Sequence, residues 1–530
     1  MKKLIFALIV ILNLNPAHAN EVTIKDLIYF ESKIQSLLEN KAELADDPSA
    51  ESRHKKIHNF TNNFGHQLLN ELKEDKPLNG YQLAILNLSV GAYLQISSEY
   101  YDKLTAIEPS RTEFNGSNRT LSWAILYSQL LQDYKQTYDL FYRSTALRRV
   151  VKDQAELNNS GIGNLEEITK KILNKNKIKK LESIIIDYQL NSHKSKNKRL
   201  RAKLHSTYIY KLVEQDKSLK EFYKFGSFGI SFSDGFANTT GSLTGGLSAG
   251  FGALVGPIEW REGRLYKNKK AQKELLKKLK PLDLLLEKKS FKLTDYTIPG
   301  HWGHIGVWLG NEEQLREIGM WDSPIIKPFQ EKIRQGYSIY EVRRWGLVWD
   351  TLDHWMNLDA MAVIRHNESA SYGEKEYSRV FKELFSQIGK KYDYSFDAMT
   401  ANTITCTEII SLSYGPVNWP TTKVVGRHTL QPDNIAALVF YENSPIELVT
   451  YLEGAKTGYA FKSKAKFASL IGFRAKKSNR SQFHEKFRKC KRSKYRSNRR
   501  GGIRFKNECW SEYKDYSYEA PFDHLDGNNL

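Results

Sequence analysis

Residues 299–310 read Pro-Gly-His-Trp-Gly-His-Ile-Gly-Val-Trp-Leu-Gly. The alternation of apolar and other residues in this stretch predicts a β-strand over residues 304–309. The side chains expected to face the core are Ile305, Val307 and Leu309. His304, Gly306 and Trp308 then share the opposite face. Gly306 leaves space beside His304 for a substrate or a partner residue, so His304 is the candidate catalytic base.

The catalytic role of His304 and the identity of its partner have alternative interpretations. His304 could be a hydrogen-bonded structural histidine, and His301 in the preceding loop is a second, weaker candidate base. Residues 311–314 resemble a turn, so residues 315–320 are expected to return as a strand that places Glu317 opposite Gly306. A buried carboxylate needs a partner, which favours Glu317 as the group that orients His304. A carboxylate at the surface edge of the sheet is the alternative for Glu317, and Asp322 is the second candidate for the orienting group.

Cys406 lies in the sequence Thr405-Cys406-Thr407-Glu408. A Thr followed three residues later by Glu is a capping box, so we expect a helix over residues 405–414. The N-terminal end of a helix favours a thiolate. Cys406 is therefore a candidate nucleophile, although a free cysteine is often only a small buried apolar residue.

The N-terminal residues indicate export. Lys2 and Lys3 precede an apolar run that ends in Pro16-Ala17-His18-Ala19. This pattern is typical of a signal peptide over residues 1–19, and it predicts a periplasmic or secreted bacterial protein. A retained N-terminal membrane anchor is the alternative, but the run is short for a span.

Export changes the meaning of the three cysteines. Cys490 and Cys509 lie close together in the C-terminal region and are expected to form a disulfide under oxidising conditions. Cys406 is then left as the odd thiol.

The 530 residues are too many for one core. Residues 20–225 carry apolar side chains at helical spacing, and residues 226–262 form a Gly/Ser-rich linker segment or, alternatively, a segment that touches a membrane. Residues 263–455 mix short strands and helices, which predicts an α+β domain. The strands are expected at 282–286, 305–309, 315–320, 338–343 and 360–365, and a helix at 374–388. His54 and His58 have a metal-binding spacing, but the adjacent lysines favour a solvated helix face.

The C-terminal region, residues 456–530, is basic. Residues 462–506 hold eighteen Lys and Arg against the single acid Glu485. Interleaved aromatic residues and this charge favour binding to an anionic envelope polymer or to lipid headgroups. Nucleic acid is the less favoured partner of an exported chain, and a solvated surface with no dedicated partner is the alternative.

Four segments together resemble a known family. They are residues 295–310, residues 315–319, residues 391–396 (Lys-Tyr-Asp-Tyr-Ser-Phe) and residues 406–410 (Cys-Thr-Glu-Ile-Ile). In this order they resemble the YiiX/YebB-like, circularly permuted papain-like hydrolases, relatives of the NlpC-type amidases. In the permuted group the His strand precedes the Cys, as it does here.

The resemblance implies a permuted papain-like domain with Cys406 as nucleophile, His304 as base and Glu317 as third member. It also implies acyl transfer with no metal and no organic cofactor. This family often has Ser after the Cys, where this chain has Thr407.

The expected substrate is a peptide or amide bond of the cell envelope. Trp302, Trp308 and Gly306 are expected to contact it. The two tryptophans and the basic tail also allow a lipid or acyl-ester hydrolase or acyltransferase at anionic membranes. A non-catalytic envelope-binding protein is the further alternative, and the oligomeric state is left open.

Overall fold

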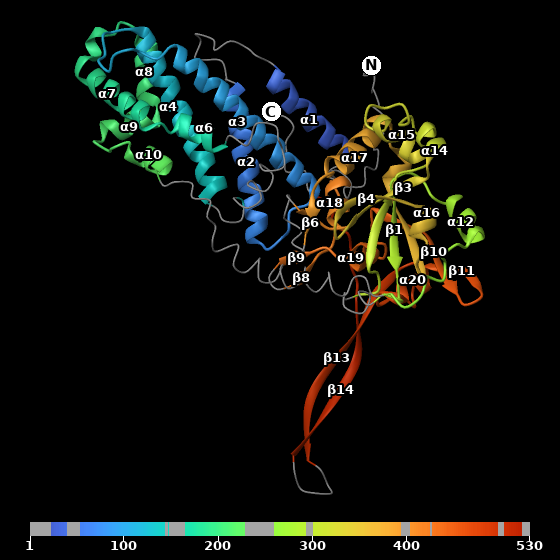
Figure 1. Cartoon of the computed structure of the whole chain (residues 1–530). Helices are drawn as coiled ribbons and strands as arrows, with labels where there is room; N and C mark the ends of the chain where they lie inside the picture. Colours follow the sequence, from blue (N-terminus) through green and yellow to red (C-terminus); the bar gives the residue numbers. More distant parts are fainter. Residues whose placement is uncertain are drawn as a thin grey trace, which may run out of the picture.

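The computed structural model describes residues 23–39, 53–143, 147, 165–227, 259–292, 300–393, 403–424, 427–496 and 503–521. The predicted signal peptide, residues 1–19, lies outside these ranges, as does most of the predicted linker, residues 226–262. Within them, helices and strands form a helical lobe, a mixed α/β domain and a two-stranded arm (Figure 1).

The N-terminal lobe is helical, as the spacing of its apolar residues predicts. Its elements are α1 (Ile24–Glu39), α2 (Arg53–Lys73), α3 (Gly80–Ala106), α4 (Asn118–Tyr138), η2 (Asp139–Arg143), α6 (Leu165–Ile172), α7 (Lys175–Asn191), η4 (Ser192–Lys194), α8 (Lys198–Ser206), α9 (Tyr208–Glu214) and α10 (Lys220–Ser227). Helix α3 begins with a capping box between Asn79 and Gln82. Large side chains such as Trp123, Tyr127 and Tyr188 are fully buried in one core, which holds the helices together.

The second domain is built on a seven-stranded antiparallel sheet in the order β11-β10-β5-β1-β2-β3-β4. Its strands are β1 (Asp283–Lys288), β2 (His304–Trp308), β3 (Tyr337–Arg343), β4 (Gly346–Thr351), β5 (Ala360–His366), β10 (Ile446–Ala455) and β11 (Gly458–Lys462). Because β11 pairs with β10, the sheet continues past residue 455, where the basic region was expected to begin.

The two faces of this sheet contribute to different cores. Ile305 and Val307 lie in the larger core, as their alternation predicts, together with Leu309 just after β2. Trp308 lies in the smaller core on the other face. Both faces of β2 are therefore covered by side chains.

Short helices and small sheets complete the domain. They are α12 (Lys269–Leu276), α14 (Glu312–Glu317), η5 (Lys327–Phe329), α15 (Gln330–Arg334), α16 (Leu352–Trp355), η6 (Asn367–Ser371), α17 (Glu374–Ser386), β6 (Lys391–Tyr392), β7 (Thr403–Ile404), α18 (Glu408–Ser413), β8 (Thr422–Val424), β9 (Arg427–Thr429), α19 (Pro432–Leu438) and α20 (Lys464–Leu470).

The prediction of a strand at residues 315–320 is wrong. Asn311 accepts a hydrogen bond from the Gln314 backbone, and the Gln314 side chain accepts one from the Asn311 backbone. This capping box starts helix α14, in which Leu315 is buried. The next strand along the chain is β3, which follows α14 and α15 and pairs with β2 on the side away from β1.

The helical lobe contacts the second domain beside α18. The Tyr81 backbone N–H donates to the Gly415 carbonyl at 3.1 Å, and Asn79 Nδ2 donates to Asn418 Oδ1 at 2.8 Å. A Cβ on Gly80 would lie 2.1 Å from the Ser411 backbone oxygen, so only glycine permits this approach.

The two-stranded arm projects away from both lobes (Figure 1). It consists of β13 (Phe483–Arg496) and β14 (Ile503–Lys514), with β12 (Phe473–Ala475) at its base. Phe473 and Phe483 are buried in the core of the second domain and anchor the arm there. No helix in the described ranges is long and apolar enough to cross a bilayer.

Candidate active site

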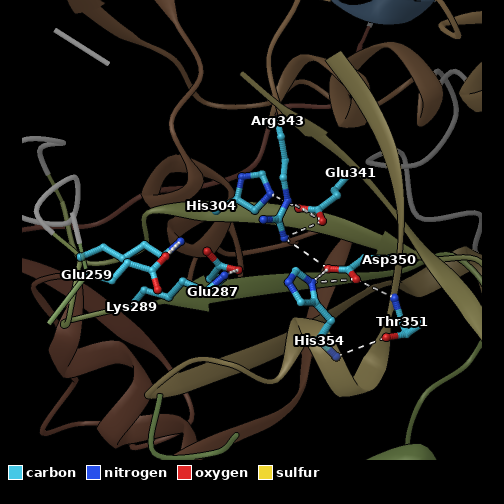
Figure 2. Close-up of polar contacts among 10 residues, drawn as sticks. Glu259, Glu287, Lys289, His304, Glu341, Arg343, Asp350, Thr351 and His354 are labelled. Atoms are coloured by element: carbon cyan, nitrogen blue, oxygen red, sulfur yellow. Dashed lines mark hydrogen bonds and ion pairs between the residues drawn. The ribbon is translucent and has the colours of Figure 1, made fainter. Parts of the chain in front are cut away.

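His304 begins β2, with β1 on one side and β3 on the other. In the β1–β2 ladder it is opposite Glu287, and two residues later Gly306 is opposite Glu341 of β3. His304 Nε2 lies 2.6 Å from Glu341 Oε2, and the Glu341 side chain is fully buried. The fold therefore brings an imidazole and a carboxylate together from adjacent strands (Figure 2).

Cys406 lies in the turn between β7 and α18. The Thr405 backbone N–H donates to Glu408 Oε2 at 2.8 Å, and the Glu408 backbone N–H donates to Thr405 Oγ1 at 3.2 Å. These are the two bonds of the predicted capping box, although α18 itself begins at Glu408. Cys406 is partly buried and is a free cysteine. Its side chain lies close enough to His304 to raise the pKa of that imidazole.

The electrostatic surroundings of His304 favour its charged form. Burial lowers its pKa, but the Cys406 sulfur, the hydrogen bond to Glu341 and the charge of Glu287 act in the opposite direction and raise the pKa to about 10. His304 is therefore protonated at neutral pH, next to the thiol. An imidazolium next to a cysteine sulfur is the arrangement that thiol-based acyl transfer uses.

A chain of charged groups supports Glu341 (Figure 2). Arg343 Nε donates to Glu341 Oε1 at 2.8 Å, and the same guanidinium donates to Asp350 Oδ2 at 3.2 Å. His354 Nδ1 lies 2.7 Å from Asp350 Oδ2. Because Glu341 has both an imidazole and a guanidinium as partners, its buried carboxylate is compensated and held in one orientation.

Glu287 supplies a second negative charge near His304. It is buried and contacts Lys289 Nζ at 2.7 Å. Burial raises the pKa of Glu287, but Lys289, His304 and Arg343 together lower it to about 2. It is therefore ionised throughout the neutral range, which favours a protonated His304.

Gly306 makes space for a partner residue of His304. A Cβ at this position would lie 2.9 Å from Cη2 of Trp355. The ring centroids of Trp355 and His304 are 5.7 Å apart. The open position beside the imidazole is thus filled by an indole from α16.

Trp302 and Trp308 do not form a substrate surface. Their exposed fractions are 1% and 3%. Trp302 packs against Tyr451 and Phe467, and Trp308 Nε1 donates to Gln314 Oε1 at 2.9 Å. The expectation that these indoles contact substrate is wrong, because core side chains enclose both.

Glu317 is not placed beside His304. It is exposed at the end of α14, because the expected returning strand is helical. Glu341 occupies the position opposite Gly306 that was assigned to Glu317. The sequence signal for Glu341 was available: it is an acid within the apolar strand predicted at residues 338–343. Adjacency of that strand to β2 was not visible in the sequence.

The other sequence candidates lie elsewhere. Asp322 has a largely exposed side chain and lies 3.6 Å from Arg316. The His301 backbone N–H donates to Asp433 Oδ2 at 2.8 Å, and burial lowers the pKa of its imidazole to about 4. His301 is therefore neutral and held by its backbone, a structural role.

His54 and His58 are buried in the helical lobe, so the expectation of a solvated face is wrong. Their Nδ1 atoms lie 3.7 Å and 3.9 Å from the buried carboxylate of Asp133. Across the described ranges, no group of three or more His, Cys, Asp or Glu side chains has a metal-binding arrangement.

Cys490 and Cys509 are joined by a disulfide across β13 and β14. They are directly opposite one another in the ladder. Cys406 is therefore the free thiol of the chain.

The comparison with protein families identifies the second domain. Residues 278–462 match the family model described as permuted papain-like amidase enzyme, YaeF/YiiX, C92 family. The match covers about a third of the chain and includes β1 to β11 together with His304, Glu341 and Cys406. No curated protein and no solved structure matches the chain.

Proposed function

Because residues 278–462 belong to the permuted papain-like C92 family and form a cysteine hydrolase domain, we propose that the chain is an exported amidase of the cell envelope. Cys406 is the nucleophile, His304 the base and acid, and Glu341 the residue that orients His304. Peptide or other amide bonds of envelope components are the substrate class.

The observation that carries this proposal is the pair of contacts made by one imidazole. His304 meets Glu341 through Nε2 at 2.6 Å, and the Cys406 side chain lies close enough to raise the pKa of the same imidazole. A nucleophile, a base and a group that orients the base are the three parts that thiol-based acyl transfer requires. The sheet supplies two of them from adjacent strands, and the capped turn before α18 supplies the third.

The reaction follows from these positions. The Cys406 thiolate attacks the substrate carbonyl carbon, a C–S bond forms, and the carbonyl electrons move to oxygen. The backbone N–H of Cys406 stabilises that oxyanion. When the intermediate collapses, the C–N bond breaks and His304 gives its proton to the leaving amine. Neutral His304 then takes a proton from water, the resulting hydroxide attacks the thioester, and the thiolate leaves.

Two observations support an amide substrate outside the cytoplasm. The matched family is described as an amidase. The disulfide Cys490–Cys509 lies on an exposed ribbon, and such bonds persist in oxidising compartments. Burial of Trp302 and Trp308 removes the argument that those indoles made for a lipid substrate.

The test compares the wild-type chain with Cys406→Ala. Each protein is incubated with purified cell-wall sacculi, and separately with phospholipid vesicles, and released products are identified by mass spectrometry. We expect amide-cleavage products from sacculi with the wild type and none with Cys406→Ala. Iodoacetamide should label the wild type at Cys406 without reductant, while Cys490 and Cys509 serve as internal controls that stay unlabelled.

The outcome also discriminates among alternatives. Release of fatty acid from vesicles would favour the lipid hydrolase. A wild-type Cys406 that fails to react, with no product from either substrate, would favour the envelope-binding protein. Undiminished cleavage by Cys406→Ala would remove Cys406 from the mechanism.

A further inference from the structure

The arm formed by β13 and β14 is one continuous antiparallel ladder. The register runs without a break from Glu485 opposite Lys514 to Arg496 opposite Ile503. At about 3.3 Å per residue, the length of β13 corresponds to roughly 45 Å. The Cys490–Cys509 disulfide joins the strands within the ribbon. The arm is therefore a cross-linked projection with two faces, and the pairing register assigns each side chain to one of them.

The first face, named here the Cys490 face, carries cations. Residues opposite one another in an antiparallel ladder share a face, as do residues two apart. Among the positions whose side chains the structure describes, its members are Lys486, Arg488, Cys490, Arg492, Lys494, Phe505, Asn507, Cys509, Ser511 and Tyr513. Ring contacts agree with this assignment, since Arg492 lies 4.0 Å from the Phe505 ring centroid and His484 lies 4.4 Å from that of Tyr513.

The opposite face, named here the Glu512 face, carries both signs of charge. Its members are Glu485, Phe487, Lys489, Lys491, Ser493, Lys506, Glu508, Trp510, Glu512 and Lys514. Lys489 contacts Glu512 at 3.2 Å, and Trp510 Nε1 donates to the same carboxylate at 2.9 Å.

The charges are thus segregated by the register. Each face holds four Lys or Arg among the members named above, but the three acids of the ribbon all lie on the Glu512 face. The four cations named on the Cys490 face are all exposed. Like charges gathered on one face repel one another, so the fold itself gains nothing from this arrangement. An anionic partner on that face would remove the repulsion.

We propose that the Cys490 face docks on an anionic lipid bilayer. The members of the Cys490 face named above offer an anionic surface four cations and no carboxylate, whereas a partner that surrounded the ribbon would also meet the three acids of the Glu512 face. Phe505 and Tyr513 are 49% and 54% exposed and lie toward the two ends of the cationic face. Aromatic rings combined with long basic side chains are typical of groups at the bilayer interface.

The ring contacts also weigh against single-stranded nucleic acid as the partner. Such binding uses free aromatic faces on which bases stack. One face of the Phe505 ring is already covered by Arg492, and Tyr513 is already packed by His484. This docking goes beyond the proposed amidase activity and holds independently of it.

The experiment measures sedimentation of the full chain with phosphatidylcholine vesicles that contain either no anionic lipid or about one-third phosphatidylglycerol. The test variant combines Lys486→Gln, Arg488→Gln, Arg492→Gln and Lys494→Gln. The matched control combines Lys489→Gln, Lys491→Gln, Lys506→Gln and Lys514→Gln. Both lose four positive charges from the same ribbon, on opposite faces. Intact mass and iodoacetamide labelling of Cys406 check the disulfide and the fold.

We expect the wild type to bind anionic vesicles and not neutral ones, and to dissociate as salt is raised. Each basic residue near an anionic bilayer strengthens membrane binding by about fivefold. The test variant, which lacks four of them, should therefore bind at least tenfold more weakly. The affinity of the control variant for anionic vesicles should fall by less than about threefold, because its four cations point away from the bilayer and are screened by salt. Equal losses in the two variants, or equal binding to neutral vesicles, would overturn the proposal. Tighter binding to a DNA oligonucleotide than to anionic vesicles at the same salt would also overturn it.

Discussion

Glu341 and His304 meet across adjacent strands, with Glu341 Oε2 2.6 Å from His304 Nε2. Two residues along β2 from His304, Gly306 is the ladder partner of Glu341. This contact identifies Glu341 as the carboxylate of the site. Because it uses Nε2 of the imidazole, Nδ1 is the ring nitrogen left for Cys406. The same carboxylate is tied to Arg343.

Replacing Glu341 tests its role as the orienting group. In Glu341→Gln the side chain keeps its size but loses the charge that stabilises imidazolium, and its amide can donate where a carboxylate only accepts. We expect kcat to fall by about 100-fold or more with a small change in KM. Glu317→Gln is the matched control and should retain wild-type kcat. A large loss of kcat in Glu317→Gln, with wild-type kcat in Glu341→Gln, would instead make Glu317 the orienting residue. Thermal melting of both variants separates this effect from unfolding.

The pH dependence of the reaction follows from His304. Its pKa is raised to about 10, so the imidazolium is present below that pH and is lost as the pH rises through it. We expect kcat/KM to persist into the alkaline range and to fall only as the pH approaches about 10. In Glu341→Gln the alkaline limb should move to lower pH, because a group that favours the charged imidazole is gone. A limb that stays in place would contradict the assignment.

The buried histidines of the helical lobe predict acid sensitivity. Burial lowers the pKa of His54 from 6.5 to about 4, with Asp133 opposing, and also lowers that of His58. As the pH falls from 6.5 towards 4, the unfolded chain takes up protons that the folded lobe excludes, so stability decreases over this window. For His54 the loss is about 3 kcal/mol.

His54→Gln should reduce that pH dependence, measured as the difference between urea midpoints at pH 7 and pH 4. His66 lies exposed on the same helix, so His66→Gln is the matched control and should keep the wild-type slope. If the difference between the urea midpoints at pH 7 and pH 4 is the same in the wild type and both variants, His54 does not determine the acid response.

Gly80 tests the contact between the helical lobe and α18. In Gly80→Ala the new Cβ would lie 2.1 Å from the Ser411 backbone oxygen, which no rotamer change can relieve. We expect a loss of about 1–3 kcal/mol in stability, read as a lower Tm, and a slower rate of iodoacetamide labelling at Cys406. Ser411→Ala is the control, because the contact uses the backbone of Ser411. Equal behaviour of the two variants would exclude a tight contact.

The disulfide is expected to stabilise the arm and not the hydrolase domain. Cys490 and Cys509 are 19 residues apart, and closing such a loop stabilises by about 3 kcal/mol in the chain-entropy model. The double variant Cys490→Ser/Cys509→Ser should be cut faster by trypsin within residues 483–514 while hydrolysis of a soluble substrate is unchanged. Intact mass should report one free thiol in the native chain and three after reduction.

The sequence alone determined the local structure around the two reactive side chains. Alternation over residues 304–309 predicted β2 and its core-facing residues. The Thr405–Glu408 box predicted a helix from residue 405, and the two bonds of the box are present, although α18 begins at Glu408 and Cys406 lies in the turn before it. These signals are local, because they depend on side-chain period and on hydrogen bonds between residues three apart.

Long-range strand pairing fixes which carboxylate serves His304 and which face of the arm carries unbalanced charge. Glu341 reaches His304 because β3 pairs with β2 after an intervening helical stretch, and strand adjacency is a long-range property. The acids of the arm face one way because of its pairing register, since opposite residues share a face. The composition of a segment gives its net charge, but strand pairing determines on which face of the ribbon each charged side chain lies.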